Sequence, residues 1–124
     1  MPLHPRTKKK LEENGIRPNI ILIDPVGYFD MLELLKYCSL VITDSGGLQK
    51  EAFFNKKHCI IVREETEWKE LVTNGFAKIA GTDKGEIVKA YEYFTNKSSD
   101  FNIELYGDQV GDKIYQSIIN LIID

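Results

Sequence analysis

Three small residues, Ser45-Gly46-Gly47, stand where an apolar run ends and a helical pattern begins. The N-terminus of a helix offers free backbone N–H groups and a partial positive charge, and glycines let an anion approach the backbone closely. The serine hydroxyl adds one more donor, so the stretch fits a cradle for phosphate. A sharp strand-to-helix turn, in which Asp44 or Ser45 only caps the helix, explains the same residues, and the local pattern does not separate the two interpretations.

A carboxylate follows the glycines at a distance of one helical turn. Glu51 is expected on the same side of the predicted helix as the N–H groups of the turn. An acid in that place can accept hydrogen bonds from ribose hydroxyls, as acids do in other nucleotide-binding folds. An exposed helix glutamate is the alternative interpretation, because most glutamates are exposed. On the same helix, Leu48, Ala52 and Phe53 form the apolar stripe, and Gln49 is expected to point elsewhere.

The elements that position these residues alternate between strand and helix. Continuous apolar runs predict four strands, and stretches with apolar residues at helical spacing predict six helices. The predicted strands are 19–24, 39–43, 58–63 and 76–80, and the predicted helices are 7–14, about 28–35, 47–55, 67–74, 83–94 and 109–123.

This alternation, with short connections, is typical of βαβ units and a parallel sheet. The strands are apolar throughout rather than alternating, which indicates that helices cover both faces of the sheet. The sequence therefore predicts an α/β fold, a Rossmann-like parallel sheet with helices on both faces, as a single domain over residues 1–124. Ligands of such sheets bind at the carboxyl ends of the strands, so the residues that follow each strand are the candidates for function.

The composition is that of an ordinary globular domain, with 43% hydrophobic and 28% charged residues. A formal net charge of -3 argues against a nucleic-acid-binding surface, which usually shows a basic excess. The one basic cluster, Arg6 and 8–10, is interpreted as a solvated helix face because Glu12 and Glu13 follow it directly. No apolar run approaches the roughly 20 residues that a membrane span needs.

The cysteines and histidines are few and lack the spacing of metal ligands. Cys38 and Cys59 each stand beside an apolar segment, which predicts buried free thiols in a reducing compartment. We expect no metal and no cofactor. Because the N-terminus also lacks the apolar core of a signal peptide, the expected location is the cytoplasm.

The motifs, taken in order, resemble one enzyme family. The stretch TDSGGLQKEA, preceded by IDPVGYFDMLELL and followed by IVREETEWKELVTNG and IAGTD, is similar to the non-hydrolysing UDP-N-acetylglucosamine 2-epimerases. The resemblance runs from His4 to the last helix and includes 106–108. It implies the C-terminal, nucleotide-binding half of a glycosyltransferase-B-type fold, whose active site lies in the cleft between two domains. The N-terminal catalytic domain of the family is absent from these residues.

The resemblance also implies roles for individual residues of the nucleotide site. Met31 stands where the family often has an aromatic residue, so an apolar contact rather than stacking is expected there. The diphosphate of UDP would be bound by Ser45, Gly46 and Gly47, the ribose by Glu51, and the uracil by Met31 and the backbone of Val26.

Three further residues, His4, Arg63 and Trp68, are candidates for the interdomain cleft. The family often has arginine in place of Trp68, within a T-E-R-P-E pattern, and the tryptophan form is similar to the branch that acts on other UDP-acetamido sugars. Core packing is the alternative for Trp68, an ion pair with Glu64 or Glu67 for Arg63, and a plain surface position for His4. Thr66 and Glu67 are expected to cap the helix that follows.

The family inverts C2 of the sugar by anti elimination of UDP and re-addition to the other face, and its catalytic acids lie in the N-terminal domain. We therefore expect no catalytic residue here and no activity of this chain alone. A stand-alone UDP-binding or regulatory module and one half of a glycosyltransferase-B-type transferase are the alternatives. Expected partners are UDP or a UDP-N-acetylhexosamine, a separate N-terminal domain chain, and a second copy, since the helix 109–123 is expected to fold onto its own domain or to mediate self-association.

Overall fold

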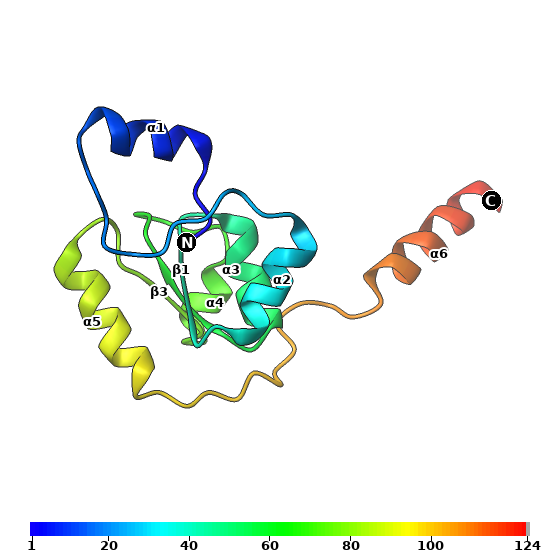
Figure 1. Cartoon of the computed structure of the whole chain (residues 1–124). Coiled ribbons are helices and arrows are strands. Elements are labelled where there is room, and N and C mark those ends of the chain that lie inside the picture. The colour runs from blue at the N-terminus through cyan, green and yellow to red at the C-terminus, as the bar shows by residue number, and fades with distance from the viewer. Residues whose placement is uncertain (124) are drawn as a thin grey trace.

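The computed structural model describes residues 1–123, and its helices and strands alternate along the chain much as the apolar pattern predicts (Figure 1). In chain order they are α1 (Pro5–Glu13), α2 (Tyr28–Tyr37), β1 (Leu40–Thr43), α3 (Gly46–Phe54), β2 (His58–Ile61), α4 (Lys69–Thr73), β3 (Ala77–Ile79), α5 (Lys84–Thr95) and α6 (Val110–Ile123). Local signals fix several ends: Asp83 accepts a hydrogen bond from the backbone N–H of Glu86 at the start of α5, and Gly15, with φ of +64°, follows α1.

The three strands form one parallel sheet in the order β1-β2-β3. Val41 lies beside Cys59, which in turn lies beside Ala77, so these three side chains share one face of the sheet. Ile60, the residue after Cys59, points to the other face. The prediction of an α/β fold with a parallel sheet is confirmed.

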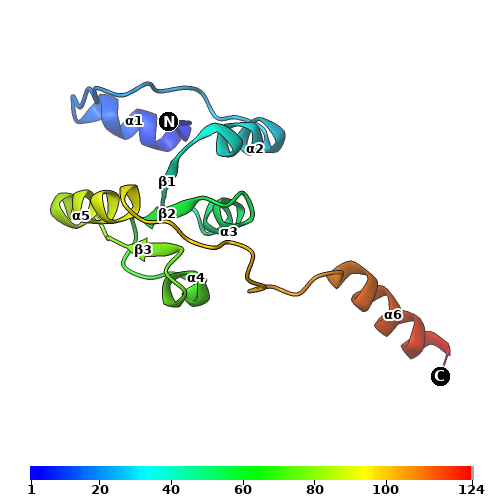
Figure 2. The ribbon, with the colours of Figure 1, turned by 90° about the horizontal axis from the view of Figure 1, so that it is seen from below.

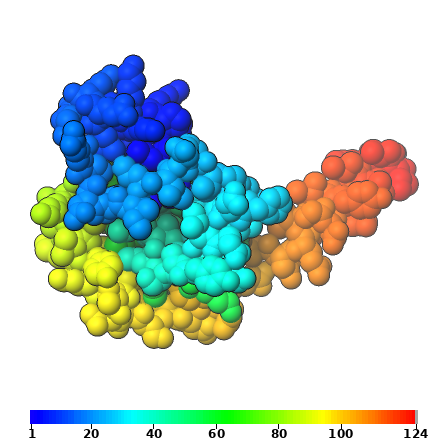
Figure 3. All heavy atoms as spheres, in the orientation of Figure 1, coloured from blue at the N-terminus to red at the C-terminus, as the bar shows by residue number. Residues whose placement is uncertain are grey.

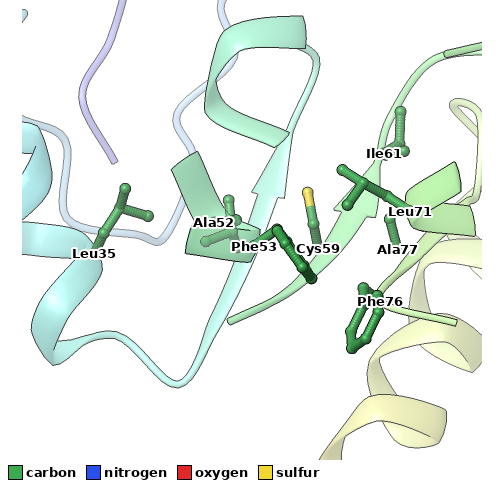
Figure 4. Close-up of a cluster of buried hydrophobic side chains, with 9 residues drawn as sticks. Leu35, Ala52, Phe53, Cys59, Ile61, Leu71, Phe76 and Ala77 are labelled. Atoms are coloured by element: carbon green, nitrogen blue, oxygen red, sulfur yellow. The ribbon is translucent and has the colours of Figure 1, made fainter. Parts of the chain in front are cut away.

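Two apolar clusters cover the two faces of this sheet. The larger joins β1, β2 and β3 to α2, α3 and α4 (Figure 4), and the smaller joins Ile60 and Ala80 to Ala90 and Phe94 of α5. Figure 2 shows α5 and α3 on opposite sides of the strands, as the continuous apolar runs predict. The larger cluster consists of Leu35, Val41, Ala52, Phe53, Cys59, Ile61, Leu71, Phe76 and Ala77.

Both cysteines are free thiols, as expected, but the prediction that both are buried is wrong for Cys38. Cys59 lies in the larger cluster with 1% of its surface exposed, and this burial raises the pKa of its thiol to about 12. Cys38 is half-buried at the end of α2, where its Sγ donates to the backbone oxygen of Leu35 at 3.4 Å.

The predicted strand 19–24 is wrong. Only an isolated parallel bridge forms there, between Pro2 and Ile23, and it is held by backbone hydrogen bonds from Leu3 N to Ile23 O and from Ile23 N to Met1 O, both 3.0 Å. Ile21 remains 82% exposed. A strand needs neighbours that pair with it and bury its side chains, and this segment meets only the three residues 1–3.

The helix α6 forms where the sequence predicts it but does not pack on the domain. None of its residues is buried, and Figures 1 and 3 show it extending away from the rest of the chain. The expectation that it folds onto its own domain is therefore wrong, because other helices already cover the apolar clusters on both faces. Self-association through α6 stays a prediction. Within residues 1–123, no helix combines the length and the apolar character that crossing a membrane requires.

Candidate functional site

Three helices begin around one hollow at the carboxyl end of β1. The hollow has a volume of about 590 Å³, and its lining includes residues from the turns that precede α1, α2 and α3. His4 stands at the start of α1, Val26 and Met31 at the start of α2, and Ser45 at the start of α3. Four of the nine residues that the sequence singles out are thus brought together, from three separate parts of the chain.

The glycine turn has the geometry that both of its interpretations require. Ser45 caps α3, since its Oγ accepts from the backbone N–H of Leu48 at 3.4 Å, and its own N–H donates to Oγ1 of Thr43 at 3.0 Å. Gly46 and Gly47 are the first two residues of α3, so their N–H groups have no acceptor within the helix. The space beside Gly47 is open: a Cβ atom there would meet no atom within 4 Å. Capping by Ser45 therefore leaves two backbone donors for an anion.

Glu51 lies one turn further along α3 and is tied to the start of α2. The hydroxyl of Tyr28 donates to Oε1 of Glu51 at 3.1 Å, and this hydrogen bond to a carboxylate raises the pKa of the tyrosine. The sequence pattern places Tyr28 on the apolar face of its helix and does not mark it as a site residue. The sequence offers one signal that could have identified Tyr28 as a site residue. It directly follows the Pro25-to-Gly27 turn, which ends the predicted strand 19–24.

Trp68 contacts the glycine turn but does not line the hollow. Its Nε1 donates to the backbone oxygen of Gly46 at 2.7 Å, while its half-buried ring packs against the larger cluster. Core packing and contact with the turn are therefore both present. The predicted cap by Thr66 and Glu67 is wrong, because α4 begins at Lys69 with Trp68 as its N-cap residue and no side-chain cap.

The hydroxyl of Thr66 has other partners. It donates to Oε1 of Gln49, which is completely buried, and accepts from the backbone N–H of Trp68 at 3.1 Å. The expectation that Gln49 points away from the core is wrong. Its burial is tolerated because the Thr66 hydroxyl is a hydrogen-bond partner for its side-chain oxygen. The Nε2 of Gln49 is buried and has no hydrogen-bond partner among the described residues. Through this pair, the loop before α4 is fastened to α3.

Arg63 pairs with Glu67, one of the two partners that the sequence left open. Its guanidinium makes two hydrogen bonds to the carboxylate, of 2.8 and 3.2 Å, which lower the pKa of Glu67. The same carboxylate lies close to the glycine turn, because a Cβ atom at Gly46 would come within 3.1 Å of its Oε2. The guanidinium thus offsets the charge of one acid beside the turn. Neither Arg63 nor Trp68 is among the residues that line the hollow.

The electrostatics of the hollow favour an anion. The N-terminal ends of α1, α2 and α3 each carry a partial positive charge, and the first residues of α2 and α3 have N–H groups without intrahelical acceptors. At the start of α1, Pro5 has no N–H group and the N–H of Arg6 donates to His4. His4 is the N-cap of α1, where its Nδ1 accepts from the backbone N–H of Arg6 at 3.2 Å. Asp44 is the acid in the lining. No three His, Cys, Asp or Glu residues among the described ones are placed to hold a metal ion.

Comparison with known proteins places this geometry among one group of enzymes. A family model described as UDP-N-acetylglucosamine 2-epimerase matches residues 1–119. The UDP-2,3-diacetamido-2,3-dideoxy-D-glucuronate 2-epimerase of Pseudomonas aeruginosa is 45% identical over 107 residues, covering 86% of this chain and 30% of that protein. The UDP-N-acetylglucosamine 2-epimerase of Methanocaldococcus jannaschii is 37% identical over 118 residues, covering 90% of this chain and 32% of that protein.

Solved structures agree with these relatives. The M. jannaschii UDP-GlcNAc 2-epimerase in complex with UDP-GlcNAc and UDP has a TM-score of 0.86 at 35% identity, and the match covers 96% of this chain and 34% of that one. The UDP-GlcNAc 2-epimerase from Neisseria meningitidis bound to UDP-GlcNAc has a TM-score of 0.67 at 28% identity, covering 99% and 35%. The chain therefore spans about a third of the length of the relatives it matches.

Proposed function

The chain belongs to the UDP-N-acetylglucosamine 2-epimerase family, and from this premise we propose that it is the nucleotide-binding part of such an enzyme. In this proposal it holds the UDP portion of a UDP-acetamido sugar at the start of α3. The observation that carries the proposal is the convergence of His4, Val26, Met31 and Ser45 on one hollow where three helices begin. A volume of about 590 Å³ lies within the range of small-molecule sites.

Each part of the nucleotide has a matching group. The diphosphate is bound by the hydroxyl of Ser45 and the free N–H groups of Gly46 and Gly47, aided by the helix dipole. The ribose hydroxyls donate to Glu51, whose carboxylate has lone pairs beyond the one that Tyr28 occupies. The uracil lies against the half-buried side chains of Val26 and Met31, with His4 in the same hollow. Arg63 and Trp68, which do not line this hollow, are proposed to face the cleft between the two domains of the family's fold.

These residues support the family's reaction by stabilising the leaving group. When the bond between C1 of the sugar and the diphosphate oxygen breaks, negative charge accumulates on UDP, and the donors around the glycine turn are aimed at that charge. In this proposal the proton transfers at C2 fall to the rest of the family's fold, where the resemblance places the catalytic acids. We therefore propose that residues 1–124 form a single UDP-binding domain that does not catalyse epimerisation alone.

The wider setting is proposed on the same basis. UDP-acetamido sugars are soluble activated precursors, which fits a cytoplasmic enzyme that supplies cell-surface polysaccharide synthesis. The relatives act on more than one sugar by name, a diacetamido uronate and N-acetylglucosamine, so the proposal extends only to the class of UDP-acetamido sugars.

Calorimetric titration of the chain with UDP tests the proposal. We expect Ser45→Ala to weaken binding roughly tenfold, because it removes one hydrogen bond to a charged oxygen, and Glu51→Gln to weaken it severalfold. Matched controls are Ser98→Ala and Glu92→Gln, both at exposed positions distant along the chain, which should bind UDP like the unmodified chain.

Two results would contradict the proposal: no heat of binding at millimolar UDP, or equal affinity of Ser45→Ala and Ser98→Ala. A chain that binds UDP but, when combined with the rest of an epimerase, supports no C2 inversion would favour the stand-alone binding module or the transferase half instead.

A further inference from the structure

We propose that Trp68 is a positioning residue for the glycine turn. Its indole N–H holds the peptide group between Gly46 and Gly47 in the orientation that presents the N–H of Gly47 to a diphosphate. Trp68 does not line the hollow, so it acts through the turn and not by touching the ligand. The inference rests on the proposed function for the identity of the ligand, a nucleoside diphosphate, and it is separate from the position of Trp68 toward the cleft.

The first step concerns the conformational freedom of the turn. Glycine has more accessible backbone conformations than any other residue, and here two glycines stand together in the first turn of α3, where the N–H groups have no acceptor within the helix. Ordering such a turn only when the ligand arrives would lower the affinity. A site built on Gly46 and Gly47 therefore needs another part of the chain to fix their orientation in advance.

The indole of Trp68 supplies this constraint. Its Nε1 donates to the backbone oxygen of Gly46 at 2.7 Å, an oxygen that the helical pattern also pairs with the N–H four residues on. The oxygen of Gly46 and the N–H of Gly47 belong to one planar peptide group and point in opposite directions. A bond that fixes the oxygen toward the indole therefore also fixes the direction of the N–H of Gly47.

The space around the two glycines agrees with this division of roles. A Cβ atom at Gly46 would lie 3.1 Å from Oε2 of Glu67 and 3.8 Å from Nε1 of Trp68, so the loop before α4 closes in on this residue. A Cβ atom at Gly47 would meet no atom within 4 Å. The protein thus holds one residue of the turn and leaves the next one open to a ligand.

Trp68 is itself held in place, as a positioning residue has to be. Its backbone N–H donates to Oγ1 of Thr66 at 3.1 Å, and the hydroxyl of Thr66 donates to the buried Gln49 of α3. The ring of Tyr106 meets the indole edge-on, with 6.1 Å between centroids and 89° between the planes. The indole is therefore fixed from two other parts of the chain.

Lys50 strengthens the hydrogen bond that the indole donates. Its ammonium lies 4.4 Å from the ring centroid of Trp68 and 4.2 Å from that of Tyr106, which is cation–π geometry with both rings. A cation above an indole draws electron density from the ring and makes its N–H a stronger donor. Lys50 stands one turn after Gly46, so the helix that carries the acceptor also carries the cation.

The unmodified chain provides the first test. Trp68 is the only tryptophan in the sequence, so its indole N–H gives a single NMR signal that needs no further assignment. An anion that accepts from the N–H of Gly47 polarises the shared peptide group and makes its oxygen a better acceptor. We expect titration with UDP to move the indole signal downfield, and titration with uridine, which has no phosphate, to leave it in place.

A variant that loses only the donor provides the second test. Trp68→Phe keeps an aromatic ring beside Lys50. It should lower the NMR order parameters of the Gly46 and Gly47 amides from about 0.85, the value of a rigid backbone, to below about 0.6. It should also weaken UDP binding about fivefold, the effect of one hydrogen bond, and leave the uridine affinity unchanged.

Tyr91→Phe is the matched control. It removes one polar hydrogen from an aromatic side chain that is 52% exposed on α5, and it should change neither the order parameters nor the two affinities. Thermal unfolding checks that both variants are folded at the temperature of the titrations. If Trp68→Phe is not folded, the indole signal of the unmodified chain decides.

Four results would overturn the inference. They are an indole signal that UDP binding does not move, unchanged order parameters of the glycine amides in Trp68→Phe, equal UDP affinity of Trp68→Phe and Tyr91→Phe, or an equal loss of affinity for uridine and UDP. Failure of the unmodified chain to bind UDP would instead overturn the proposed function, and the order parameters would then decide whether Trp68 holds the turn.

Discussion

The segment 20–23 and the strand β2 have similar sequences, IILI and HCII, in opposite environments. All four residues of β2 are buried, whereas every residue of 20–23 is exposed. β2 has a pairing strand on each side and a helix on each face, while 20–23 has only residues 1–3 beside it. An apolar run thus indicates that a segment is suited to burial, but its neighbours decide whether it becomes a strand.

The largest test of this contrast is the same truncation in both places. Ile61→Ala should lower the free energy of unfolding by about 3 kcal/mol, because it leaves a cavity in a closed cluster. Ile21→Ala, at a side chain that is 82% exposed, should change it by less than about 0.5 kcal/mol. Urea unfolding of the two variants measures both values, and a cost at Ile21 near that at Ile61 would show that 20–23 is buried in solution.

A second test extends the contrast between buried and exposed positions to two polar side chains outside these segments. Thr66→Val removes the hydroxyl that contacts Gln49 and should cost about 1–3 kcal/mol, because the buried amide is left without a partner. Thr7→Val makes the same change at an exposed position of α1 and should cost less than about 0.5 kcal/mol. Thermal unfolding resolves the difference, and equal midpoints would mean that the Gln49 contact contributes nothing.

The smallest expected effect is a pH dependence. The buried ring of His58 stacks on Phe94 with 4.6 Å between centroids, and its Nε2 lies 2.8 Å from Oγ of Ser99. Burial, with a contribution from Lys97, lowers the pKa of His58 below its usual value near 6.5. The unfolded chain therefore binds a proton at higher pH than the folded chain, and stability should fall as the pH drops below about 6.5.

His58→Gln should flatten this fall in stability between pH 7.5 and 5, and His4→Gln, in the less packed segment, should retain it. Chemical unfolding at several pH values measures the slope for each variant. An unchanged slope in His58→Gln would assign the acid sensitivity to other groups.

Local signals account for most of the fold that the sequence predicts. Caps and turn glycines such as Asp83 and Gly15 act within a few residues, so the helices and the strands β1, β2 and β3 were placed to within a few positions. The prediction of a strand over 19–24 was wrong because strand formation there depends on a pairing neighbour, which local pattern does not reveal. The pairs Gln49–Thr66 and Tyr28–Glu51 lie 17 and 23 positions apart, so their hydrogen bonds needed the folded geometry.

The candidate site was predictable to the extent that topology determines it. Parallel strands bring the residues that follow them to one edge, which is why His4, Val26 and Ser45 meet at a single hollow. The partner of Arg63 was not predictable, because Glu64 and Glu67 both lie within a few positions of it and only the turn geometry selects Glu67. The assignment of these residues to UDP remains a prediction.

The different burial of the two cysteines gives this protein a built-in labelling site. Alkylation proceeds through the thiolate, so Cys59, with its pKa near 12 and 1% exposure, should resist iodoacetamide at pH 8. Modification of the native chain should therefore stop at one equivalent, on Cys38. Because Cys38 lines the hollow beside Ile23, a fluorophore attached there would report on that side of the domain without a single substitution in the sequence.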